Sequence, residues 1–184
     1  MKNKEYLTYT YLHRKAFLYC VNELITDPED KKEMLKRARK HDLDKSLMYT
    51  LIPKADASRI HREYSSHHME NGLEKDRYDI MEAVIDYECA ALTKPDKPLN
   101  AYDTVHEYGS AHKKELLECM KELGIDYSYK RKCDFEFENY IQGYLPVTDE
   151  SILCEVYDFA SMYPQEAQFF LSLSRDVIKK DATL

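Results

Sequence analysis

Histidines gather in the first part of this chain: five of the seven lie between positions 13 and 68, with a His-Asp pair among them. Neutral imidazole and carboxylate ligands together suit borderline divalent ions such as manganese, iron, zinc and nickel. Side chains from several helices converge on such ions inside helical bundles. We therefore expect one or two divalent metal ions, with the candidate ligands His13, His41, Asp42, His61, His67, His68 and Asp86.

Helical periodicity is expected to position the first of these ligands. From about Glu5 to Ile25, apolar residues recur at steps of three and four, which is typical of an amphipathic helix, and His13 lies on the apolar stripe. Asp27 is expected to cap a second helix, with Pro28 at its first position and its end near His41. The His-Asp doublet would then lie where a buried face ends.

The rest of the chain also predicts helices. The basic run at 36–40 is most simply a solvated helix face. A helix capped by Asp56 or Ser58 is expected to carry both His61 and His68, two turns apart. Only 4 Gly and 6 Pro occur in 184 residues, which favours an all-α fold. The other expected helices cover about 45–51, 75–92, 102–105, 111–123, 133–140, 149–162 and 165–179.

The order of His13, the 41–42 doublet and Asp86 resembles the HD superfamily of metal-dependent phosphohydrolases. The minimal signature of that superfamily is a His on the first helix, a His-Asp doublet ending the second, and a later Asp. The segment HDLDKS at 41–46 is similar to the extended His-Asp-x-x-Lys motif of the HD-GYP branch. The further histidines make the pattern most similar to a small bacterial and phage branch of the superfamily.

The resemblance implies an HD-like helical bundle over residues 1–95 and a C-terminal helical extension over residues 96–184. It implies that Asp42 bridges two ions and that His13, His41 and Asp86 complete the first of them. His61 and His68 would hold the second ion, with His67 as the competing choice.

Lys45 receives a role from the same resemblance, and Asp44 and Glu82 receive theirs from the general chemistry of such a metal site. Lys45 would hold a phosphate oxygen of a small phosphorylated substrate, such as a nucleotide. Asp44 and Glu82 would orient the ligand imidazoles through their other ring nitrogen or relay a proton. The Gly-Tyr-Pro motif is absent and the apolar run before the doublet is replaced by Lys-Arg-Ala-Arg-Lys, so hydrolysis of cyclic di-GMP is not expected.

Two other functions stay open at this point. Di-iron oxygenases of the HD type, such as myo-inositol oxygenase, use a similar His/Asp set to activate oxygen. A non-catalytic regulatory or interaction module could keep the metal site as structure. Each ligand also has a structural interpretation, since a single histidine on an apolar stripe such as His13 is more often a hydrogen-bonded core residue.

The composition of the chain limits the kinds of partner and the cellular compartment that we expect. The net charge of -7 disfavours duplex nucleic acid and anionic membranes as partners. The Met-Lys-Asn-Lys start has no apolar signal region and no stretch is long enough to span a bilayer, so we expect a cytoplasmic protein. The five cysteines form no CxxC pair, which favours reduced and mostly buried thiols. The sequence leaves open whether the chain forms a homo-oligomer.

Overall fold

The computed structural model describes residues 3–94, 99–129 and 135–181, and all regular structure within these ranges is helical. The all-α prediction is therefore confirmed for the described part of the chain. The chain divides into two compact units. Unit 1 comprises Met1–Tyr11, Lys40–Tyr64 and Pro146–Leu184, and unit 2 comprises Leu12–Arg39 and Ser65–Leu145. The predicted boundary at residue 95 divides the chain differently and stays a prediction.

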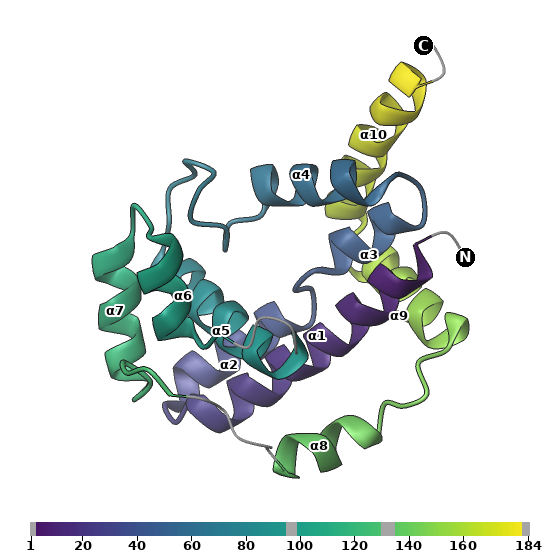
Figure 1. Cartoon of the computed structure of the whole chain (residues 1–184). Coiled ribbons are helices and arrows are strands. Elements are labelled where there is room, and N and C mark those ends of the chain that lie inside the picture. The colour runs from purple at the N-terminus through teal and green to yellow at the C-terminus, as the bar shows by residue number, and fades with distance from the viewer. Residues whose placement is uncertain (1–2, 95–98, 130–134, 182–184) are drawn as a thin grey trace. The chain divides into compact units, whose positions relative to one another are not determined.

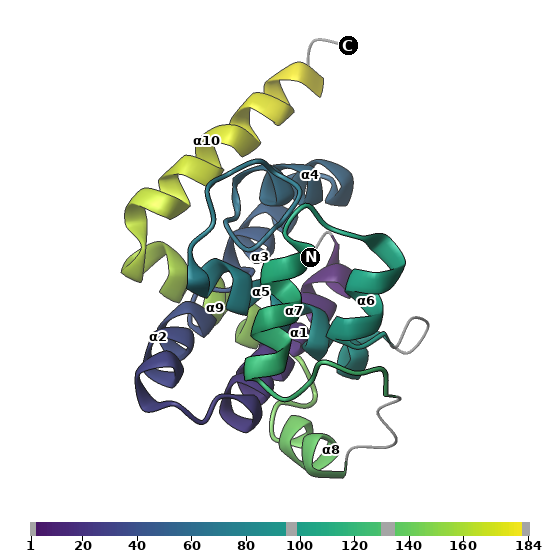
Figure 2. The ribbon, with the colours of Figure 1, turned by 90° about the vertical axis from the view of Figure 1, so that its left-hand side faces the viewer.

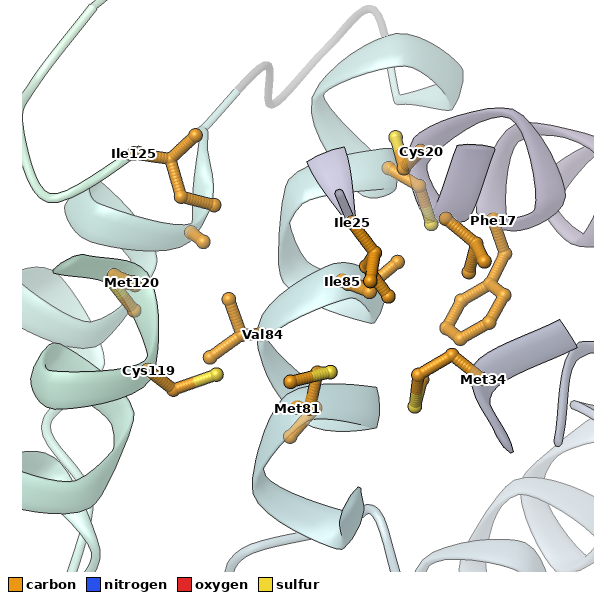
Figure 3. Close-up of a cluster of buried hydrophobic side chains, with 14 of the residues drawn as sticks. Phe17, Cys20, Ile25, Met34, Met81, Val84, Ile85, Cys119, Met120 and Ile125 are labelled. Carbon is orange, nitrogen blue, oxygen red and sulfur yellow. The ribbon is translucent and has the colours of Figure 1, made fainter. Parts of the chain in front are cut away.

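Unit 2 is built around α5 (Arg77–Thr93), which packs against α2 (Pro28–Ala38), α6 (Ala101–Tyr108) and α7 (Lys113–Glu122) (Figure 1). Residues 79–85 of α5 are all buried, so this part of the helix is enclosed around its whole circumference. In Figure 3, Val84 points toward side chains of α7, and Ile85 points toward the second part of α1 (Lys4–Leu24). The core is mixed aliphatic and sulfur-containing, with the labelled side chains Phe17, Cys20, Ile25, Met34, Met81, Val84, Ile85, Cys119, Met120 and Ile125.

Unit 2 also contains α8 (Phe135–Gln142), a short helix visible in both ribbon views (Figures 1 and 2). It attaches through aromatic rings: the centroids of Phe137 and Tyr140 each lie 5.3 Å from the ring of Tyr19. An aromatic pair at this separation stabilises the fold by about 0.5–1.5 kcal/mol, in addition to the contribution of the apolar area that it buries. Part of the predicted helix 133–140, including Cys133, lies outside the described residues.

Unit 1 packs α3 (Leu43–Tyr49) against α4 (Lys54–Tyr64), α9 (Asp149–Met162) and α10 (Pro164–Asp181) (Figure 2). A seven-residue helix is not stable by itself, because helix nucleation costs more than so few hydrogen bonds return. All but one of the residues of α3 are buried, so packing within the unit supplies its stability. The start of α1 joins this unit through an ion pair of 2.9 Å between Lys4 and Asp149.

The predicted second helix begins as its sequence indicates. The Asp27 carboxylate accepts hydrogen bonds from the backbone amides of Glu29 and Asp30, and Pro28 occupies the first helical position. The α5 helix starts with a reciprocal capping box between Asp76 and Asp79. Side-chain oxygens thus satisfy amides that would otherwise lack helical partners.

Several helix ends differ from prediction. The second helix ends at Ala38 rather than near His41. The predicted caps Asp56 and Ser58 are wrong, because α4 already starts at Lys54, and the Pro53 carbonyl accepts its first hydrogen bond. This helix stops at Tyr64, so His68 is not on it, contrary to prediction. Among the described residues, no helix is long and apolar enough to cross a membrane.

Candidate metal centre

The first cluster of candidate ligands belongs to unit 1 and is called the Asp42 group; it consists of Asp42, Asp44, Lys45 and His61. The His61 side chain comes from α4, and the other three residues come from α3 and the residue that precedes it. Asp42, Asp44 and His61 are buried, and their ligand atoms all lie within 4.8 Å of one another. Charged side chains are rarely buried in this way unless they are paired or bind a metal.

The His61 ring lies between two carboxylates. Its Nδ1 is 2.7 Å from Oδ2 of Asp44, and its Nε2 is 3.1 Å from Oδ1 of Asp42. A carboxylate that accepts the proton of one ring nitrogen fixes the tautomer and directs the other nitrogen. Asp44 therefore holds the contact expected of an orienting residue, and Nε2 is directed at Asp42.

Lys45 contacts the same aspartate from another side. Its Nζ lies 2.5 Å from Oδ2 of Asp42, and the lysine side chain keeps 19% of its surface exposed. Burial raises the pKa of Asp42, but the nearby charges of Lys45, His41 and His61 outweigh it and hold that pKa well below the ordinary value. Asp42 is therefore ionised at neutral pH and able to bind a cation.

Asp44 and His61 shift the pKa of one another. Burial raises the pKa of Asp44, but the charge and hydrogen bond of His61 lower it further, so the net shift is downward. Burial lowers the pKa of His61, but the carboxylates of Asp44 and Asp42 together outweigh it, and the net shift is upward. The surrounding carboxylates therefore favour a bound proton or another cation at the His61 imidazole.

The backbone at Asp42 is unusual. Its φ of 60° and ψ of 7° lie in the left-handed region, which residues other than glycine seldom adopt. Such a conformation costs about 1 kcal/mol, and strained residues cluster at functional sites. The turn allows the chain to leave α2, place Asp42 and start α3 within a few residues.

His41 completes the ligands of unit 1. Its side chain is fully buried, and its Nε2 lies 4.0 Å from Oδ1 of Asp42. The predicted doublet thus places both of its side chains in the interior of the protein.

A second cluster lies in unit 2 and is called the His13 group; it contains His13, Asp86, Cys89 and Thr93. Nε2 of His13 lies 2.7 Å from Oδ1 of Asp86. Its Nδ1 lies 3.3 Å from the hydroxyl of Thr93 and 3.7 Å from the sulfur of Cys89. His13, Asp86 and Cys89 bring their ligand atoms within 4.8 Å of one another.

Glu82 belongs to a charged network in unit 2. Its carboxylate lies 3.4 Å from Nδ1 of His67 and accepts a hydrogen bond of 3.1 Å from Arg37. Arg37 also donates to Asp79 at 2.8 Å. Burial raises the pKa of Asp79, but hydrogen bonds from Ser66 and Arg37 bring the net pKa below its ordinary value. Glu82 thus has the contact to His67 that an orienting role requires.

His67 and His68 are carried by the loop between α4 and α5. Their ring centroids are 4.6 Å apart, and Nδ1 of His68 lies 3.4 Å from Glu70. The ammonium of Lys75 donates three hydrogen bonds of 2.7 Å to this loop, including one to the backbone carbonyl of His68. Lys75 therefore fixes the loop that presents both histidines.

Sequence reasoning missed several residues of these groups. Arg37 was expected on a solvated face, and this is wrong, because its half-buried guanidinium binds acidic side chains of α5. For Cys89, the sequence alone predicts only a reduced and buried thiol. Its position three residues after Asp86, with Thr93 one turn further, was a readable signal, since side chains at these spacings share a helix face.

The predicted ligands belong to both units: His41, Asp42 and His61 to unit 1, and His13, His67, His68 and Asp86 to unit 2. Comparisons of the chain with protein-family models, with curated proteins and with solved structures found no match.

Proposed function

We propose that this protein is a metal-dependent phosphohydrolase in which the Asp42 group and the His13 group bind divalent ions. The observation that carries the proposal is the His61 imidazole, held at Nδ1 by Asp44 and directed through Nε2 at Asp42. A carboxylate, an imidazole and a metal ion in this order are a recurrent arrangement in metalloproteins.

The donor atoms fit a divalent ion. Two ligands that are each about 2.0–2.2 Å from one ion lie about 2.8–3.1 Å apart at the right angles of an octahedron and about 3.3–3.6 Å apart in a tetrahedron. Nε2 of His61 is 3.1 Å from Oδ1 of Asp42, which fits the octahedral spacing. The competing interpretation is a buried ion-pair network. Asp42 and Asp44 carry two negative charges and Lys45 one positive charge, so a protonated His61 would balance the group without a metal. A divalent ion would displace that proton.

The residues of the Asp42 group have distinct tasks in the proposed reaction. Asp42 and His61 would hold the ion, which supplies a water ligand of near-neutral pKa and polarises a phosphoryl oxygen. Asp44 keeps the Nδ1 proton of His61 in place. Lys45, whose side chain is 19% exposed, would bind a phosphate oxygen of a nucleotide-like monoester or diester while its ammonium remains beside Asp42.

The test is elemental analysis of protein purified without chelator or metal-affinity tag, combined with phosphate release from mono- and cyclic nucleotides. Bound metal and phosphate release that are both lost in Asp42→Asn and in His61→Ala support the proposal. The matched controls are His106→Ala and Asp56→Asn, because His106 and Asp56 lie outside both groups and are less buried. These controls should keep both metal and activity.

Two outcomes contradict the proposal. Wild-type protein without metal, even after incubation with manganese, zinc or iron, would assign the Asp42 group to structural ion pairing. Bound iron without release of phosphate from any substrate would overturn the hydrolase assignment and favour oxygen chemistry.

A further inference from the structure

The His13 group contains one donor that the ligand order of the HD superfamily does not include, the thiol of Cys89. Asp86 and Cys89 are three residues apart on α5, so their side chains project from the same face. The Cys89 sulfur lies 3.7 Å from Nδ1 and 3.8 Å from Nε2 of His13. Nitrogen, oxygen and sulfur donors from three residues thus meet in one place.

Hydrogen bonding around Thr93 indicates which nitrogen of His13 faces a ligand. The Thr93 hydroxyl donates its proton to the backbone carbonyl of Cys89 at 3.3 Å. Its oxygen then accepts a proton from Nδ1 of His13, 3.3 Å away. This places a proton on Nδ1 and leaves Nε2 as the nitrogen whose lone pair can bind a metal.

The lone pair of Nε2 then points at a second acceptor. Oδ1 of Asp86 is only 2.7 Å away, and two electron pairs approach this closely only with a positive species between them. That species is a proton or a metal ion. A metal ion there would have a thiol within reach, because the Cys89 sulfur lies 3.8 Å from Nε2 of His13.

We infer that His13, Asp86 and Cys89 bind one divalent ion and that the Cys89 thiolate makes the site selective for zinc-like metals. The inference deepens the proposed function, because it assumes that the His13 group is a metal site. Ligands of tetrahedral zinc lie about 3.3–3.6 Å apart. The 3.8 Å between Nε2 and the sulfur is close to this spacing, and the 2.7 Å between Nε2 and Oδ1 of Asp86 would widen when the ion replaces a shared proton. Soft thiolate favours zinc, cobalt(II) or iron(II) over magnesium and manganese.

Cys89 changes its hydrogen bonding when the ion binds. In the structure its thiol donates to the backbone carbonyl of Asp86 at 3.3 Å, an ordinary contact within a helix. Metal binding removes the thiol proton to solvent and replaces that hydrogen bond with a metal–sulfur bond. The Asp86 side chain keeps 18% of its surface exposed, so the carboxylate is the part of the site that solvent ions reach.

The test is a titration of metal-free protein with Co²⁺, without oxygen and with a phosphine as the reductant. Cobalt(II) accepts the ligands of zinc, and a thiolate ligand produces a strong sulfur-to-cobalt absorption band in the near ultraviolet. We expect this band in the wild type and in Cys20→Ser, whose thiol is equally buried. Cys89→Ser should lose the band, and its Zn²⁺ affinity should fall by more than about tenfold.

Three results would overturn the inference. Visible cobalt absorption without the near-ultraviolet band in the wild type would show metal binding without a thiolate, which leaves the proposed function intact. A band that survives in Cys89→Ser would assign another cysteine. No cobalt binding by the wild type would refute both this inference and the proposed metal site. The wild-type spectrum decides these cases even if Cys89→Ser fails to fold.

Discussion

The contact between Asp44 and His61 offers the sharpest test of how the Asp42 group works. Asp44→Ala removes the acceptor for Nδ1 of His61, 2.7 Å away in the native protein. The imidazole is then free to rotate or to carry its proton on Nε2, and a protonated Nε2 cannot bind a metal. Asp44→Asn keeps an oxygen acceptor in the same place but removes the charge.

Burial sets the size of the effect. Asp44 and His61 are both almost fully enclosed, so Asp44→Ala leaves a buried N–H group without an acceptor. This costs about 1–3 kcal/mol of unfolding free energy. Loss of such an orienting partner weakens metal binding by about 10- to 100-fold, or about 1.4–2.8 kcal/mol. Asp44→Asn should lose about tenfold or less, because a neutral hydrogen bond is roughly half as strong.

The assay is competition for Zn²⁺ and Mn²⁺ against a fluorescent chelator, with urea unfolding of the metal-free proteins alongside. Asp56→Ala is the control, because Asp56 is a half-exposed carboxylate on the same helix as His61 and contacts only Arg59 among the described ion pairs. It should leave metal affinity unchanged and alter stability by less than about 1 kcal/mol.

Metal affinity in Asp44→Ala that equals the wild-type value would refute the orienting role. Equal losses in Asp44→Asn and Asp44→Ala would show that the charge of Asp44, and not its hydrogen bond to His61, supports the metal.

Three further predictions concern stability. Arg37→Gln leaves the buried Asp79 without its cation and should lower the unfolding free energy by about 3 kcal/mol, whereas Arg77→Gln, at an exposed pair, should cost less than about 1 kcal/mol in the same urea titration. In metal-free protein, Asp42→Gly should be more stable than Asp42→Ala by about 1 kcal/mol, because only glycine adopts a φ of 60° without strain; equal thermal midpoints would contradict this. The hydrogen bond from Arg77 lowers the pKa of Asp30 below its ordinary value of 3.8. The stability that this pair adds should therefore be complete above pH 3.8 and vanish as the pH falls through the lowered pKa. The unfolding curves of the wild type and Arg77→Gln should then converge at low pH.

The helices could be predicted wherever periodicity and capping residues agree. Asp27 and Pro28 marked the start of α2 because a carboxylate and a proline act locally on the first helical turn. The end of α4 at Tyr64 could not be predicted in this way. Ser65 to Asn71 are compatible with a helix, and the loop is fixed by Lys75 through contacts that no local pattern reveals.

The candidate site shows the same division. Residue type and order singled out His61, Asp44 and Glu82, because imidazoles and carboxylates are the side chains that bind metals or orient ligands. The role of Arg37 was missed because the other cations of its run, Lys36, Arg39 and Lys40, are exposed. Its partners Asp79 and Glu82 lie more than forty residues away. A charge run by itself does not reveal that one member turns inward.

The composition of unit 1 has a consequence for synthesis on the ribosome. The short helix α3, which follows Asp42, packs against α9 and α10, and these are encoded about a hundred residues later. When synthesis has reached Leu145, the segments of unit 2 are all present, but α3 has only α4 to pack against and still lacks α9 and α10. Such late, long-range contacts slow folding and leave nascent chains open to chaperones and to aggregation. The candidate metal ligands around Asp42 would therefore be the last part of the protein to mature.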